Sequence, residues 1–158
     1  AIDGVGRHMQ LLTIDGVDHA PTGSEYGPVH ELQQWEASFC PLSTNDISTD
    51  PRGEDWLVFE TEARIMLMGL PAQDPLPVGE PFMETRQKHP AVAINAQGET
   101  LVVWGEAISH TRGGRLNMRL LRDGLPAPEF SFSDEIQISD FSFPAAAALP
   151  NGNFLVLY

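Results

Sequence analysis

The stretch Ile47-Ser-Thr-Asp-Pro-Arg-Gly53-Glu-Asp-Trp-Leu-Val-Phe59 decides the fold, because the chain contains two further versions of it. They are Val92-Ala-Ile-Asn-Ala-Gln-Gly98-Glu-Thr-Leu-Val-Val-Trp104 and Ala147-Ala-Leu-Pro-Asn-Gly152-Asn-Phe-Leu-Val-Leu-Tyr158. Each copy is an apolar stretch, a turn that ends in Gly, an apolar strand, and an aromatic residue six places after the Gly. The glycines lie 45 and 54 positions apart. A period near 50 indicates a repeat architecture.

The repeat extends to four short segments in each unit. The stretch from Arg7 to Gly16 matches the stretch from Arg115 to Gly124 in its Arg, Met, Leu and Asp-Gly positions, and Arg64 opens a shortened version. Apolar runs bounded by Gly, Pro, Asn and Asp predict strands. Asp or Asn opens the turn between the first two segments, and Gly closes it at positive φ. In the clearest unit we expect strands at Ala91–Ile94, Leu101–Trp104, Leu116–Leu121 and Glu129–Phe132.

Four-stranded antiparallel units that recur near 50 residues are typical of β-propeller blades. We therefore expect an all-β fold in a single segment: a half-blade at about 7–36, blades at about 44–85 and 89–133, and a half-blade at about 141–158. This is about three blades' worth of strands, fewer than propellers usually have. The chain is then either a fragment of a larger propeller or a subunit completed by oligomerisation. We favour the fragment, because a finished domain avoids unpaired edge strands.

One place departs from the strand pattern. Leu32, Trp35 and Phe39 have helical spacing, so a short helix is expected in the connection that contains them.

Charge and composition exclude several classes of partner. The 158 residues carry a net charge of −13 with only 9 basic side chains. Nucleic acid and anionic membrane surfaces are therefore poor partners. No apolar run approaches the ~20 residues that span a bilayer. The one cysteine, Cys40, cannot form an internal disulfide and is expected to be a buried structural thiol.

No cofactor or metal site is expected from a motif, and calcium binding is left open as an alternative. Acidic residues gather in two groups, but neither has the spacing of an EF-hand loop, so no motif supports calcium binding. The histidines are scattered over different units and form no short metal-ligand pair. The acidic groups are Asp46, Asp50, Glu54 and Asp55, and Asp134, Glu135 and Asp140; the histidines are His8, His19, His30, His89 and His110.

Part of the repeat resembles a known motif. Ser48-x-Asp50-x-x-Gly53-x-x-Trp56 is similar to the Asp box (BNR repeat) of sialidase-like propellers, although here the Gly comes one residue late and the Thr is missing. The stretches 88–106 and 144–158 resemble blade repeats of large secreted bacterial proteins, so the resemblance covers about residues 47–158. It implies that Asp50 bonds its own hairpin and that Trp56 packs between blades.

For activity, the resemblance implies less. A sialidase needs an arginine cluster that grips a carboxylate, a Tyr-Glu nucleophile pair and an acid. Arg7, Arg64 and Arg115 begin equivalent segments and are the candidate ligand-binding residues, with pairing to a nearby Glu as the structural alternative. The family's Arg-Ile-Pro motif is absent, since Arg64-Ile65 continues into Met66. No catalytic residue can be named.

The remaining repeat positions are expected to be structural, with the aromatic ones in the core. They are Asp50, Gly53, Trp56, Phe59, Asn95, Gly98, Trp104, Gly152 and Tyr158. The sequence thus predicts a noncatalytic binding or structural propeller segment of a larger secreted, periplasmic or cell-surface bacterial protein. The alternatives are part of a sialidase-like glycan hydrolase and a self-assembling, glycan-binding, lectin-like oligomer.

Overall fold

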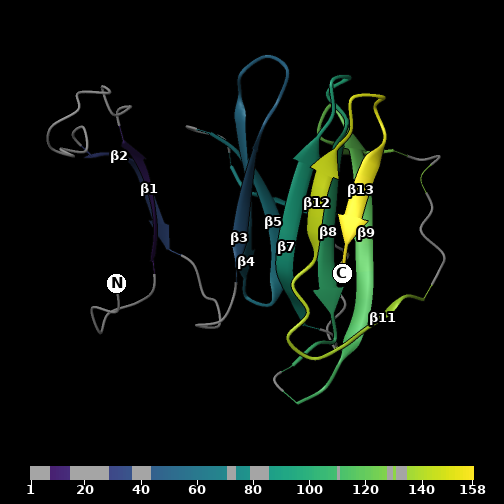
Figure 1. The fold of residues 1–158 in the computed structure, drawn as a ribbon. Coiled ribbons are helices and arrows are strands. Elements are labelled where there is room, and N and C mark those ends of the chain that lie inside the picture. Colours follow the sequence, from purple (N-terminus) through teal and green to yellow (C-terminus); the bar gives the residue numbers. More distant parts are fainter. Residues whose placement is uncertain are drawn as a thin grey trace, which may run out of the picture. The chain divides into compact units, whose positions relative to one another are not determined.

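The computed structural model of the chain describes residues 8–14, 29–36, 44–70, 74–78, 86–109, 111–127, 130 and 135–158, with only the backbone given for 8–14 and 29–36. Every regular element in these ranges is a β-strand, all the sheets are antiparallel, and no helix occurs there (Figure 1). The expected all-β class is therefore confirmed. The chain divides into two compact units, Ala1–Ser38 and Phe39–Tyr158.

The first unit contains the antiparallel hairpin of β1 (His8–Ile14) and β2 (Val29–Glu36). The expected short helix is wrong where the structure describes it, because Leu32 and Trp35 both lie in β2. Two apolar residues three apart are a weak helical signal. Pairing with β1 runs along β2 except at Leu32, where the register shifts, so a ladder and not a helix satisfies most of these backbone groups. Phe39, the third residue of that pattern, lies outside the described residues.

The second unit begins with a four-stranded sheet, here called the first sheet. Its strands are paired in chain order, so that the sheet is a simple meander with short connections. The strands are β3 (Asn45–Thr49), β4 (Asp55–Thr61), β5 (Arg64–Gly69) and β6 (Leu76–Pro77).

The second sheet repeats this meander. Four strands are again paired in chain order, and β11 adds to β9 beyond the place where β10 pairs. Three of the four strands expected in this unit are present as β7, β8 and β9; of the fourth, only Phe130 is described, and it lies outside any strand. The strands are β7 (Gln87–Ile94), β8 (Thr100–Glu106), β9 (Gly114–Arg122), β10 (Leu125–Pro126) and β11 (Gln137–Ile138).

The C-terminal hairpin consists of β12 (Ala145–Ala148) and β13 (Phe154–Leu157). It packs against β7 and β8 of the second sheet, on the side of that sheet away from the first. The three pieces are thus layered in chain order: first sheet, second sheet, C-terminal hairpin. Figure 1 shows the hairpin in front of β8 and β9.

Two apolar cores hold these layers together, and alternation along the strands of the second sheet supplies both. One face of β7 and β8 packs against the first sheet, where Val92, Val102 and Trp104 contact Val58 and its neighbours. The opposite face packs against the hairpin. Because both of its faces are covered, β7 is buried along its whole length, as is β8.

The three aromatic positions of the repeat do not share one environment. Phe59 and Trp104 are buried at 2% and 5% exposure, but Tyr158 is 59% exposed. The expectation that Tyr158 belongs to the core is therefore wrong. Trp104 lies within β8 and is paired with Asn117 of β9, whereas Tyr158 follows β13 and is not part of the ladder between β12 and β13.

Candidate functional site

The first turn, Asp50–Gly53, joins β3 to β4 and is held by one carboxylate. Asp50 Oδ1 accepts hydrogen bonds from the backbone N–H groups of Arg52 (2.8 Å) and Glu54 (2.9 Å). Gly53 closes the turn at φ +84°, and its N–H donates to the Asp50 carbonyl. The Asp side chain therefore replaces backbone partners that the turn would otherwise lack.

Arg52 lies on the same turn and folds back on it. Its Nε and Nη2 donate to Asp50 Oδ2 at 3.1 and 3.0 Å, and Nη2 also donates to Glu54 Oε2 at 3.0 Å. The Glu54 N–H and the Arg52 guanidinium hold the pKa of Asp50 below its ordinary value, despite the burial of the carboxylate. Asp50 in turn raises the pKa of Arg52. The first turn thus carries an ion pair between Arg52 and Asp50, and the lowered pKa favours the ionised form of the Asp50 carboxylate.

The second turn, Asn95–Gly98, has the same backbone design with an amide in place of the carboxylate. Asn95 Oδ1 accepts from the N–H groups of Gln97 (3.0 Å) and Glu99 (2.9 Å), and Gly98 closes the turn at φ +81°. Asn95 Nδ2 donates to Glu99 Oε2 at 2.7 Å. That bond, together with the Arg122 guanidinium 2.7 Å from the other carboxylate oxygen, lowers the pKa of Glu99.

The Asn side chain also closes the gap to the third turn, Leu149–Gly152. Asn95 Nδ2 donates to the carbonyl of Gly152 at 2.9 Å, and the Gln97 side chain lies against Gly152, where a Cβ would come within 2.9 Å of Oε1. The side chain of Asp50, one repeat earlier, has no N–H that could make the equivalent bond. The junction of the second and third turns is therefore tied by a side chain, and the junction of the first and second turns is not.

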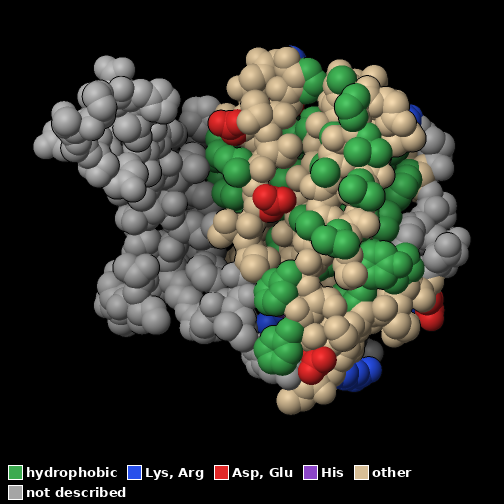
Figure 2. Space-filling model, in the orientation of Figure 1, with side chains coloured by type: hydrophobic (Ala, Val, Ile, Leu, Met, Phe, Trp, Pro, Cys, Tyr) green, Lys and Arg blue, Asp and Glu red, His purple; other side chains and the backbone are tan. Residues whose placement is uncertain are grey.

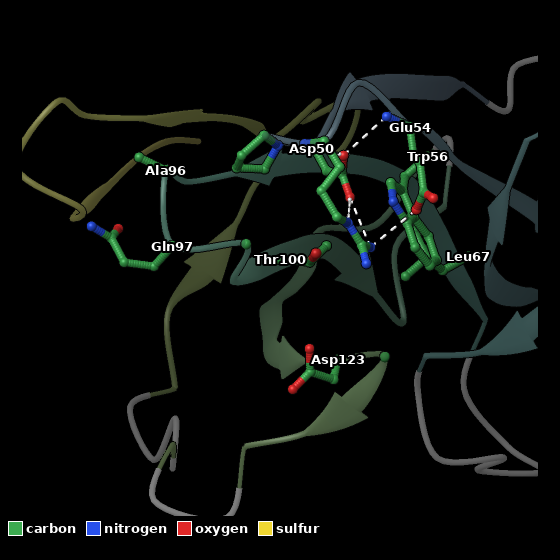
Figure 3. A pocket seen from close by; sticks show the side chains of 12 residues that line it. Asp50, Glu54, Trp56, Leu67, Ala96, Gln97, Thr100 and Asp123 are labelled. Atoms are coloured by element: carbon green, nitrogen blue, oxygen red, sulfur yellow. Dashed lines mark hydrogen bonds and ion pairs between the residues drawn. The ribbon is translucent and has the colours of Figure 1, made fainter.

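At this untied junction the structure has a pocket of about 530 Å³, here called the junction pocket. Figure 3 shows Asp123 across the pocket from Asp50, with Trp56 and Gln97 on the other two sides. The volume lies in the range of small-molecule sites. The lining residues come from both turns, from the turn after β9, and from β4, β5 and β8: Asp50, Pro51, Arg52, Glu54, Trp56, Leu67, Ala96, Gln97, Gly98, Thr100, Asp123 and Gly124.

The lining combines one aromatic ring with polar groups of several kinds. Trp56 is half-buried, and it packs against the core of the first sheet as well as lining the pocket. Three carboxylates, those of Asp50, Glu54 and Asp123, face a single guanidinium. The pocket can therefore offer hydrogen-bond acceptors, an amide and an apolar surface, while its net charge is negative.

The first acidic group of the sequence is occupied by contacts within the protein. Asp46 Oδ2 accepts from Val92 N–H at 3.0 Å, and Asp55 Oδ1 accepts from the Thr49 hydroxyl at 2.6 Å. Asp50 and Glu54 hold the first turn, as described above. Within the described residues, no group of three or more His, Cys, Asp or Glu side chains is arranged to hold a metal ion.

Two of the candidate arginines are described; they lie at the starts of corresponding strands and do not line the junction pocket. Arg64 begins β5 and is exposed, and Arg115 lies at the start of β9, where its Nη1 is 3.6 Å from Glu135 Oε1. Arg7 lies outside the described residues. A carboxylate-binding cluster of the three arginines stays a prediction.

The sequence contains a signal for the junction pocket that the resemblance to the Asp box does not reveal. Asp50 and Asn95 occupy the same place in two copies of one turn. In the structure, the difference between these two residues separates a junction that is tied from one that is open.

Comparison with protein-family models, curated proteins and solved structures gave no match for this chain. The resemblance to sialidase-like repeats therefore rests on its residues alone. A search of the described residues for a helix long and apolar enough to span a membrane gave none.

Proposed function

We propose that the chain is a noncatalytic β-propeller segment of a larger secreted or cell-surface bacterial protein, and that its junction pocket binds a neutral glycan. The architecture supports the first part. Two meanders of four strands in chain order follow one another, and the C-terminal hairpin repeats the first two strands of such a unit. This is the strand order of propeller blades.

The packing of the first strands supports a radial arrangement. The opening strands of the three units, β3, β7 and β12, are neighbours in that order, since β7 contacts β3 and β12. β7 is the edge strand of the second sheet, and its Val92 N–H, which faces away from β8, is satisfied by Asp46 of β3. In a propeller, the strand at one edge of each blade lies beside its counterparts around the channel.

The lining of the junction pocket is the single observation that carries the ligand proposal. Sugars present hydroxyl pairs along their edges and C–H groups on their faces. Carboxylates and amides form hydrogen bonds with the hydroxyl pairs, and an aromatic ring bordering the pocket can pack against the C–H groups. Asp123, Gln97 and Glu54 supply the polar groups, and Trp56 supplies the ring.

The charge of the pocket favours a neutral sugar over a sialylated one. Asp50, Glu54 and Asp123 outnumber Arg52, and the Arg52 guanidinium is already engaged by two carboxylates. A second carboxylate from a ligand would meet like charges in a partly enclosed space. The sialidase-like alternative would have to use another part of the protein.

A glycan array and a fluorogenic sialoside assay test the proposal together. We expect binding to neutral glycans, no turnover of the sialoside, and about tenfold weaker glycan binding in Asp123→Asn, because a carboxylate acceptor is replaced by a weaker amide. Asn is well tolerated at the positive φ of 49° found at Asp123, so the turn should persist. Asp140→Asn, an exposed change outside the pocket lining, is the matched control. Preference for sialylated glycans, or turnover, would contradict the proposal.

A further inference from the structure

The two interfaces between successive layers use equivalent residues. Trp56 and Val58 of β4 pack toward Val92 and Val102 of the second sheet. One repeat later, Leu101 and Val103 of β8, which hold the same places relative to the turn glycine, pack toward the C-terminal hairpin. On the hairpin, the residues that pack against Leu101 and Val103 are Ala146, Phe154 and Val156. Each unit thus presents one kind of face to the unit that follows it.

The C-terminal hairpin has a face equivalent to the one that Leu101 and Val103 present to the unit after them, and on the hairpin this face is exposed. Counting from Gly152 as from Gly98, Leu155 and Leu157 correspond to Leu101 and Val103. The pairing of Ala145 with Leu157 and of Ala147 with Leu155 places these four side chains on one side of the hairpin. Leu155 is 58% and Leu157 71% exposed, whereas Leu101 and Val103 are 3% and 0% exposed.

The open face is apolar in a strongly acidic protein. β12 and β13 contain no charged residue, although the chain carries a net charge of −13. Figure 2 shows hydrophobic side chains gathered on the side of the molecule where β12 and β13 lie. Contiguous apolar surface of this kind marks an interaction site.

We propose that the face formed by Ala145, Ala147, Leu155 and Leu157 receives a further unit of the same repeat, carried on the same polypeptide. The occupant would present apolar residues at the places of Val92 and Val102, which are Val92 and Val102 at the first interface and Ala146 and Val156 at the second. Both of those interfaces join consecutive units of one chain, and the proposed contact continues the series. The inference rests on the first part of the proposed function, a segment of a larger repeat protein, and it does not depend on the ligand of the junction pocket.

A second copy of the chain fits this face less well. The partner would have to use the face that carries Val92 on the second sheet or Ala146 on the hairpin. Both faces are already covered by the layers that precede them. On the first sheet, Leu57 and Phe59 correspond to Val102 and Trp104, and they are only 6% and 2% exposed. Ile47, at the place of Val92, is 49% exposed, so the described part of a second copy offers only part of a face of the required kind.

An extended chain tests the proposal. Residues 105–158 are appended directly after Tyr158, because Tyr158 occupies the place of Trp104 and Gly105 then follows in register. Leu155→Lys is introduced into the original and the extended chains, and melting temperatures are compared. We expect a change within about 1 °C in the original chain, where Leu155 is exposed, and a loss of roughly 5 °C or more in the extended chain, where the appended hairpin covers it.

Further readouts make each outcome decisive. In a matched control extension, the appended copy carries Lys in place of Val156, and the sensitivity to Leu155→Lys should disappear. The proposal is overturned if the extended chain folds without that sensitivity, or if it does not fold. It is also overturned if light scattering shows that the original chain is a dimer that Leu155→Lys dissociates, since a second copy would then occupy the face.

Discussion

The side-chain amide of Asn95 donates a 2.9 Å hydrogen bond to the backbone carbonyl of Gly152 and so ties the turns of two successive repeats together. One repeat earlier, Asp50 occupies the same place and bonds its own turn in the same way, but a carboxylate has no hydrogen to donate. The junction pocket lies where this tie is missing. The junction with Asn95 is therefore closed by a side-chain hydrogen bond, and the junction with Asp50 is open.

Asn95→Asp should destabilise the protein more than Asp50→Asn. The first change removes both donations of the amide and places a carboxylate beside Glu99, at a position only 2% exposed. We expect a loss of about 1–3 kcal/mol in the free energy of unfolding. Asp50→Asn keeps the acceptor that the turn uses and weakens only a contact with an exposed arginine, so the melting temperature should change by about 2 °C or less. Equal losses in chemical denaturation would contradict the account of the two turns.

The stability of the protein should fall on acidification. Asp50 and Glu99 have pKa values below the ordinary ones in the folded state. Each therefore contributes stability that is fully present above its unfolded pKa, near 4, and is lost as the pH falls through the lower folded value. Melting temperatures between pH 7 and pH 3 should decline below about pH 4.5, and the decline should be smaller in Glu99→Gln. Glu135→Gln, which removes an exposed carboxylate, should leave the decline unchanged.

Gly114→Ala should be far more damaging than Gly98→Ala. A Cβ on Gly114 would collide with the carbonyl oxygen of Glu106 and crowd the backbone at Ile108, and neither can move without disturbing the second sheet. Gly98 has open space around its Cβ position but a φ of +81°, so Ala there costs only the strain of a left-handed residue, about 1–2 kcal/mol. We expect a loss above ~3 kcal/mol for Gly114→Ala. A smaller loss for Gly114→Ala than for Gly98→Ala would show that β8 and β9 do not approach as closely at Glu106 and Gly114 as described.

Ala63→Gly should stabilise the protein. Glu62 and Ala63 form the two-residue connection between β4 and β5 with φ values of 49° and 61°, a conformation that normally selects Asn and Gly. Relief of the strain at Ala63 should raise the free energy of unfolding by roughly 0.5–1 kcal/mol, because the strain exceeds the added entropy of Gly. Ala96→Gly, in the second turn at a residue without positive φ, should have no stabilising effect. A gain at Ala96 comparable to that at Ala63 would contradict this explanation.

The sequence predicted the parts of the fold that local chemistry determines. The Asp or Asn to Gly turns and the apolar strands around Ala91–Ile94 and Leu101–Trp104 follow from side-chain bonding and β-propensity alone. The Glu62-Ala63 turn carries no such signal, because neither residue favours positive φ. The exposure of Tyr158 and the strand in place of a helix at Leu32 depend on which surfaces and strands lie opposite, and spacing within one segment does not contain that information.

The central claim, that the junction pocket is the binding site, is tested most directly by the indole N–H signals of Trp56 and Trp104 in a ¹⁵N spectrum. The chain has three tryptophans, so the signals are assigned with Trp56→Phe and Trp35→Phe, and the remaining signal is that of Trp104. The protein is then titrated with a neutral oligosaccharide selected on the array. Trp56 lines the pocket, whereas Trp104 is buried at 5% exposure between the two sheets. We predict that the Trp56 signal shifts in a saturable manner while the Trp104 signal stays in place. Saturable binding that leaves the Trp56 signal unmoved would contradict the claim.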